Sequence, residues 1–90
     1  MEIIGKIVVV LPVQTGANKS GKAWSKQVYV LEETDARYPQ KVVFELFGEQ
    51  RIKDADLHID EVVKLYFSID GSEYNGKWYS KNNGFRVEKQ

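Results

Sequence analysis

Apolar and polar residues alternate in short runs along most of the chain, a pattern typical of half-buried β-strands. The runs cover residues 3–13, 24–33, 41–47, 62–70 and 77–88, so we expect five strands and an all-β fold. Residues 14–22 are rich in Gly, Ser and Asn, and we interpret them as a loop that belongs to no element.

The alternation is interrupted between the third and fourth runs. Residues 49–56 are mostly polar and place Ile52 and Ala55 three positions apart, which predicts a short amphipathic helix. Five strands with one short helix between strands 3 and 4 is the order of the OB-fold, a Greek-key barrel. An SH3-like barrel is the main alternative, but it has no helix at that point. We therefore predict a single OB-fold domain over residues 1–90.

Asn75-Gly76 predicts a two-residue type I′ turn, because both central positions of that turn need positive φ. Tyr74 then lies opposite Lys77, and alternate cross-strand pairs point to opposite sides. Counting from the core residues of the fourth strand, we expect Trp78 to share the interior side and Tyr79 the outer side with Tyr74. The interior set of this hairpin is then Val63, Leu65, Phe67, Ile69 and Trp78.

The third strand holds an aromatic residue that its alternation does not explain. Val42, Phe44 and Leu46 form the interior set, so Phe47 falls on the outer side with Glu45. In the second strand the pattern leaves two choices open, with either Val28 and Val30 or Tyr29 and Leu31 facing inward. The side occupied by Trp24 is undecided.

The formal net charge is zero and the pI is near 6.6, so the whole chain lacks the basic excess of a strong nucleic-acid binder. The lysines are nevertheless grouped. One group lies between residues 14 and 27 and the other between residues 77 and 90, with most acids elsewhere. In an OB-fold these two segments fall in or beside the loops that clamp oligonucleotides.

Several chemistries are not supported by the residues present. The chain has no cysteine and a single histidine, His58, so we expect no metal site, disulfide or cofactor. The carboxylates near residues 54–61 surround a helix end, which does not predict an acid/base pair. We expect a non-enzyme with no small-molecule substrate and no membrane segment. Glu2 stands where a signal peptide is basic, so we expect a cytoplasmic protein.

The segments GKAWSKQVYVLEET, YPQKVVFELFG and EYNGKWYS together resemble domain-of-unknown-function family 3127, small uncharacterised bacterial proteins with a presumed OB-fold. A more local pattern, KVVFELFG followed by a helix and an aromatic-tipped hairpin, resembles single-stranded DNA-binding proteins. The second resemblance implies that Phe47 and Tyr74 stack on bases, with Trp24 at the edge of the same groove.

Our leading hypothesis is a non-catalytic protein that binds single-stranded DNA, with RNA as the alternative nucleic acid. Aromatic rings would stack on bases and loop lysines would contact phosphates; the candidates are Trp24, Phe47, Tyr74, Tyr79, Lys22, Lys26, Lys77 and Lys81. The competing hypothesis is a protein-interaction or homo-oligomerisation module that buries the same aromatic face.

Overall fold

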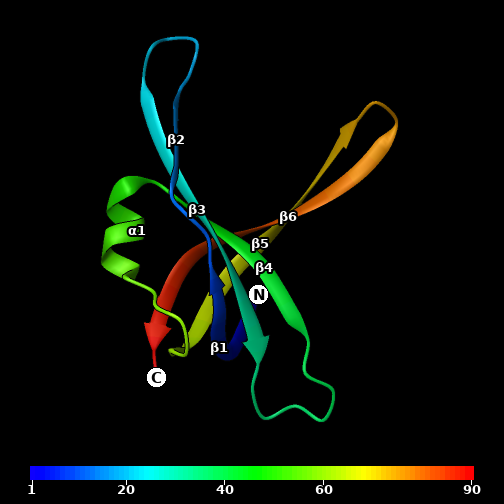
Figure 1. The fold of residues 1–90 in the computed structure, drawn as a ribbon. Coiled ribbons are helices and arrows are strands. Elements are labelled where there is room, and N and C mark those ends of the chain that lie inside the picture. The colour runs from blue at the N-terminus through cyan, green and yellow to red at the C-terminus, as the bar shows by residue number, and fades with distance from the viewer.

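The protein consists of six strands and one short helix in a computed structural model that describes all residues 1–90 (Figure 1). In chain order these are β1 (Glu2–Val10), β2 (Gln14–Ala17), β3 (Ala23–Glu33), β4 (Lys41–Phe47), α1 (Glu49–Ala55), β5 (Val62–Tyr74) and β6 (Lys77–Lys89). The expected all-β character is confirmed, as is the one helix between the strands over 41–47 and 62–74.

Five of the strands form a closed ring. The order around it is β1, β5, β6, β4 and β3, and β3 pairs again with β1. All these pairings are antiparallel except that of β4 with β6, which are parallel and joined through Glu45 and Asn83. The ring therefore closes through one narrow contact between β4 and β6.

The core fills the inside of this ring. Val42 is half-buried, and Phe44 and Leu46 are fully buried, as the alternation of β4 predicts. The open choice in β3 falls to Tyr29 and Leu31, which are fully buried. The complete set of buried hydrophobic residues is Ile7, Tyr29, Leu31, Phe44, Leu46, Ala55, Leu57, Val63, Leu65 and Phe67.

Helix α1 adds its apolar side to this core. Ala55 is buried, and Ile52 is partly buried against the core cluster, as their spacing predicts. The helix ends at Ala55 and is capped by Asp56, whose backbone is left-handed with φ of 43°. Leu57 follows directly and is buried, so α1 and the residue after it cover one part of the ring interior.

The segment expected to be a loop over residues 14–22 is partly a strand, which corrects the prediction. Gln14 to Ala17 form β2 and pair with β3, from Gln14 opposite Lys26 to Ala17 opposite Ala23. At the tip, the Asn18 side-chain oxygen accepts hydrogen bonds from the backbone N–H groups of Ser20 and Lys22, at 3.0 and 2.9 Å. Small and polar residues thus build a hairpin here, because the turn satisfies its own polar groups.

The β5–β6 hairpin has the predicted turn and register. Asn75 and Gly76 have φ of 52° and 78°, and Glu73 lies opposite Trp78. The expected interior position of Trp78 and Ile69 is wrong, since their side chains are 73% and 54% exposed. The strands extend past Phe67 as an arm on which nothing packs, so alternation no longer separates inside from outside.

Candidate nucleic-acid interface

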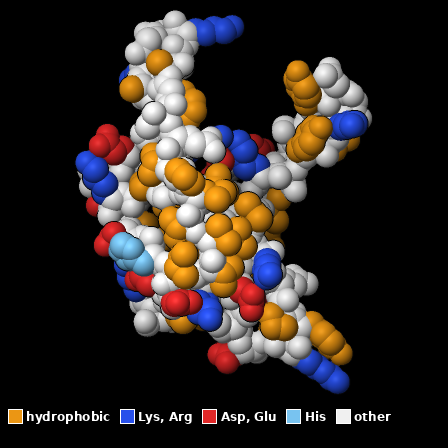
Figure 2. Space-filling model, in the orientation of Figure 1, with side chains coloured by type: hydrophobic (Ala, Val, Ile, Leu, Met, Phe, Trp, Pro, Cys, Tyr) orange, Lys and Arg blue, Asp and Glu red, His pale blue; other side chains and the backbone are white.

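Two hairpin arms extend from the same side of the ring, one formed by β2 with the start of β3 and the other by the ends of β5 and β6 (Figure 1). Basic side chains lie on both arms and between them (Figure 2). The outer side of β3 and β4 forms the surface at the base of the arms. We call the cluster of Trp24, Lys26, Glu45, Phe47 and Lys81 on this surface the inter-arm face.

Trp24 and Phe47 stack on the inter-arm face. Their ring centroids are 6.3 Å apart and their planes differ by 22°, a separation and tilt within the range of favourable aromatic pairs. The contact follows from register, because Phe47 lies opposite Lys26 in the β3–β4 ladder and Trp24 is two residues before Lys26 on the same side. Phe47 stays 55% exposed, so much of its ring remains open to solvent.

Two glycines allow this arrangement. Gly16 of β2 lies opposite Trp24, and a Cβ added there would come within 2.5 Å of the indole atom Cζ2, so the indole needs the missing side chain. Gly48 follows Phe47 with φ of 108°, a conformation that favours glycine, and turns the chain from β4 into α1. Phe47 therefore sits at a sharp corner of the chain, with Trp24 held between it and β2.

Lys26 and Lys81 reach the inter-arm face from opposite sides and share one carboxylate. The Nζ atoms of Lys26 and Lys81 lie 3.9 and 3.4 Å from the two carboxylate oxygens of Glu45, whose side chain is only 12% exposed. Lys26 Nζ also lies 5.9 Å from the centroid of the Trp24 ring, which is within cation–π range. Two positive charges and one negative charge leave the cluster with a net charge of +1.

A shallow groove of about 230 Å³ runs beside Glu45 between the outer side of β3 and β4 and the base of the β5–β6 arm. Val28 and Val43 line one wall, and Ser80 and Lys81 line the other. The Asn82 side-chain amide donates a 2.9 Å hydrogen bond to the Val43 carbonyl, which fixes the base of the arm against β4.

The remaining predicted residues lie away from this cluster. Tyr74, Lys77 and Tyr79 are exposed near the tip of the β5–β6 arm, and their cross-strand pairing places them on one side of it and Trp78 on the other. Lys22 is exposed in the turn of the opposite arm. The structure thus brings together Trp24, Lys26, Phe47 and Lys81, and it places Lys22, Tyr74, Lys77 and Tyr79 on the arms.

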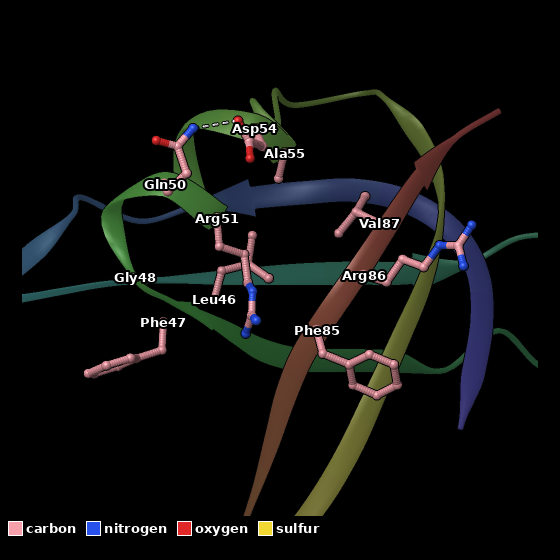
Figure 3. A pocket seen from close by; sticks show the side chains of 10 residues that line it. All are labelled: Leu46, Phe47, Gly48, Gln50, Arg51, Asp54, Ala55, Phe85, Arg86 and Val87. Carbon is pink, nitrogen blue, oxygen red and sulfur yellow. Dashed lines mark hydrogen bonds between the residues drawn. The ribbon is translucent and has the colours of Figure 1, made fainter.

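Sequence reasoning missed a second concave surface beside Phe47. A hollow of about 520 Å³ lies between α1, the end of β4 and the last part of β6, with Phe47, Arg51, Phe85 and Arg86 among its lining residues (Figure 3). Phe85 lies where a bulge shifts the β5–β6 register, so simple alternation did not place it. The signal in the sequence is an arginine, Arg51, on the polar side of the predicted helix. In the structure this arginine forms no ion pair.

Titration shifts arise outside the inter-arm face. Burial raises the pKa of the Tyr29 phenol to about 12. A hydrogen bond from Lys89 lowers the pKa of Glu61, whose carboxylate also accepts from the His58 backbone N–H. No group of three or more His, Asp or Glu side chains is placed to hold a metal ion. Helix α1 lacks the length and apolar character needed to cross a membrane.

The molecule is thus a small, mostly β protein whose closed strand ring carries two hairpin arms and an aromatic-basic surface between them. The chain belongs to the family described as domain of unknown function (DUF3127), whose model matches residues 2–88. Among curated proteins, no match to the chain was found.

Proposed function

We propose that the strand ring is an OB-fold barrel and that its inter-arm face binds single-stranded nucleic acid, DNA in preference to RNA, without catalysis. Two features support the barrel assignment. The helix lies between β4 and β5, the position of the OB-fold helix, whereas SH3-like barrels lack it. The ring also closes through the third and fifth of its own strands, β4 and β6, and this closure fits the Greek-key topology of an OB-fold barrel.

The observation that carries the binding proposal is the Trp24–Phe47 stack with Lys26 beside it. Exposed rings next to basic side chains form the usual platform for unpaired bases and their phosphates. Each stacked base contributes roughly 1 to 3 kcal/mol in such sites. Phe47 at the centre, whose exposed ring is backed by Trp24, and Tyr74 and Tyr79 on one arm can therefore support binding in the micromolar range.

Charge sets the expected character of this binding. Lys26 and Lys81 share Glu45, so they offer phosphate less positive charge than two free lysines would. Lys22 and Lys77 form no ion pair and are free to contact the phosphates of the nucleic acid. For about three neutralised phosphates, log Kd should change with log salt concentration by a slope of about 2. Duplex DNA should bind far more weakly, because its bases are already stacked.

Fluorescence anisotropy of labelled oligo-dT and of a duplex of equal length tests the proposal. Wild-type protein should bind the single strand at low salt and bind the duplex at least tenfold more weakly. Phe47→Leu should weaken binding at least fivefold, because it removes the ring but keeps apolar volume. Tyr38→Leu is the matched control, because Tyr38 is an exposed ring in the loop at the opposite ends of β3 and β4. Equal affinities of Phe47→Leu and wild type would reject the stacking platform.

A second candidate function is self-association through the same outer side of the sheet. Val9, Val30 and Val43 are cross-strand neighbours on β1, β3 and β4, and Val43 is largely exposed. Apolar side chains gather on the ring below the two arms (Figure 2). A continuous apolar row of this kind is typical of interfaces between subunits.

The molar mass of the free protein in solution tests this candidate. Self-association predicts a mass above that of the 10.4 kDa chain, and Val43→Lys should return it to the monomer value. A monomer at all concentrations would exclude self-association and leave the inter-arm face free for another ligand.

A further inference from the structure

The hollow beside α1 lies next to the inter-arm face and shares one residue with it. Phe47 stacks on Trp24 and is also a wall of the hollow. On the far side, Phe85 of β6 lies at the rim of the same hollow, where its ring packs against Tyr66 with centroids 6.5 Å apart and stays about half exposed. A nucleic-acid strand that stacks on the inter-arm face therefore meets a second exposed aromatic residue across the hollow from Phe47.

Arg51 supplies an unpaired positive charge in this hollow. Its side chain extends from α1 toward the space between Phe47 and Phe85 (Figure 3). Arg51 forms no ion pair, whereas Arg86 is paired with Glu88 at 3.0 Å. Asp54 is the one acid that lines the hollow, and its carboxylate accepts a 2.8 Å hydrogen bond from Gln50. The cationic guanidinium of Arg51 is thus available to an anion.

We propose that this hollow is a further nucleotide subsite, in which Arg51 binds a phosphate and Phe85, at the rim, stacks on the adjoining base. The inference rests on the proposed binding of single-stranded nucleic acid at the inter-arm face. A guanidinium binds phosphate through paired N–H donors, which makes arginine the common choice for this contact. A volume of about 520 Å³ lies within the range of small-molecule sites, and its open form admits a base from a continuing strand.

The subsite extends the path of the nucleic acid along the molecule. The strand would pass from the groove beside Lys81, over Phe47, to Phe85 at the helix. The strands β4 and β6 touch at Glu45 and Asn83. Phe47 lies two residues after Glu45 on β4, and Phe85 lies two residues after Asn83 on β6, so the path continues beyond this contact. Binding should therefore depend on Arg51 and Phe85 as well as on residues between the arms.

The test measures the affinity of oligo-dT of 12 nucleotides at several salt concentrations. Arg51→Ala should weaken binding about fivefold at low salt and reduce the salt slope by about 0.7, the value for one phosphate contact on a single strand. Arg51→Lys should keep the slope. Phe85→Leu should weaken binding about fivefold with the slope unchanged. Arg37→Ala is the control, since Arg37 is another exposed arginine beside an aromatic ring, that of Tyr38, in the β3–β4 loop.

The outcomes separate the two proposals. Wild-type affinity and slope in Arg51→Ala, with Phe47→Leu still impaired, would overturn the subsite and leave the inter-arm face intact. Absence of oligonucleotide binding by the wild type would overturn both. Thermal unfolding followed by circular dichroism confirms that each variant is folded, which is expected because Arg51 and Phe85 are exposed.

Discussion

The ammonium of Lys81 on β6 lies 3.4 Å from the Glu45 carboxylate on β4, next to the point where these two strands close the ring. The same carboxylate also pairs with Lys26. Glu45 therefore holds two cations in place on a surface that we propose meets phosphate. Its negative charge should help to order the lysines and at the same time oppose the approach of an anionic strand.

Replacing Glu45 by Gln should increase the affinity for oligo-dT. The amide keeps the shape of the side chain but removes the negative charge. That charge repels phosphate and partly offsets the positive charges of Lys26 and Lys81. We expect about a threefold to tenfold gain at low salt and a steeper salt slope. Glu2→Gln is the matched control, because the Glu2 carboxylate also pairs with a lysine, at 3.6 Å from Lys64 Nζ, but lies away from the two arms. An unchanged or weaker affinity of Glu45→Gln would show that phosphate does not approach these lysines.

Trp78→Ala should leave the stability of the protein almost unchanged. The indole is 73% exposed on an arm beyond the core, and such surface substitutions usually change the free energy of unfolding by at most about 0.5 kcal/mol. Phe44→Ala is the comparison, because Phe44 is fully buried and its loss should cost about 3 to 5 kcal/mol. Urea unfolding of both variants provides the measurement. A cost above about 2 kcal/mol for Trp78→Ala would place the indole against the body of the protein.

Gly16→Ala should disturb the aromatic stack while leaving the core intact. The new methyl group would meet the Trp24 indole, and β2 carries no residue of the core cluster. We expect a changed near-ultraviolet circular dichroism signal from the tryptophans and weaker binding of oligo-dT. Thr15→Ala, at the neighbouring position of β2, should change neither property. Identical spectra for Gly16→Ala and wild type would mean that the indole does not lie against Gly16.

Tyr29 should make stability decline at alkaline pH. Burial raises the pKa of its phenol to about 12, from an ordinary value near 10. Below pH 10 the phenol is neutral in both states, so this stabilisation is fully present. Between pH 10 and 12 the unfolded chain releases the proton first, which lowers the free energy of unfolding by about 2 to 3 kcal/mol in total.

The comparison of wild type with Tyr29→Phe isolates this effect from other groups that titrate at high pH. The variant loses the phenol and its 2.6 Å hydrogen bond to the Gln27 side chain, so it starts less stable. Its stability should then fall less steeply between pH 10 and 12. If the free energies of unfolding of the two proteins fell in parallel with pH, the pKa of the Tyr29 phenol would be the same in the folded and unfolded states, which contradicts this prediction.

Much of the fold could be predicted from the sequence because each core strand buries one of its two sides, which produces a clear alternation of apolar and polar residues. The alternation in β4 identifies Phe44 and Leu46 correctly, and the helix is visible where the period changes at residues 49–56. The predictions for Trp78 and Ile69 are wrong for the converse reason. Beyond Phe67 the strands continue without any covering layer, and alternation records only position along a strand, not whether something packs on it.

The candidate site was predicted in part. Phe47 stands out in the sequence because a large ring shares a side with charged residues, and it lies in the stack with Trp24. Glu45 could not be recognised as the partner of two lysines, since Lys81 lies far away in sequence and reaches it only through the β4–β6 contact. Arg51 and Phe85 likewise line one hollow only because the fold brings the helix and the last part of β6 to the same region of the ring.

The most direct test of the binding proposal follows the fluorescence of Trp24 alone. The chain has two tryptophans, so Trp78→Phe leaves Trp24 as the single reporter at the centre of the inter-arm face. Titration with unlabelled oligo-dT at low salt should quench this emission to saturation, and added salt should reverse the quenching. Emission that stays constant, together with unchanged anisotropy of a labelled oligonucleotide, would contradict the proposal that this face binds single-stranded nucleic acid.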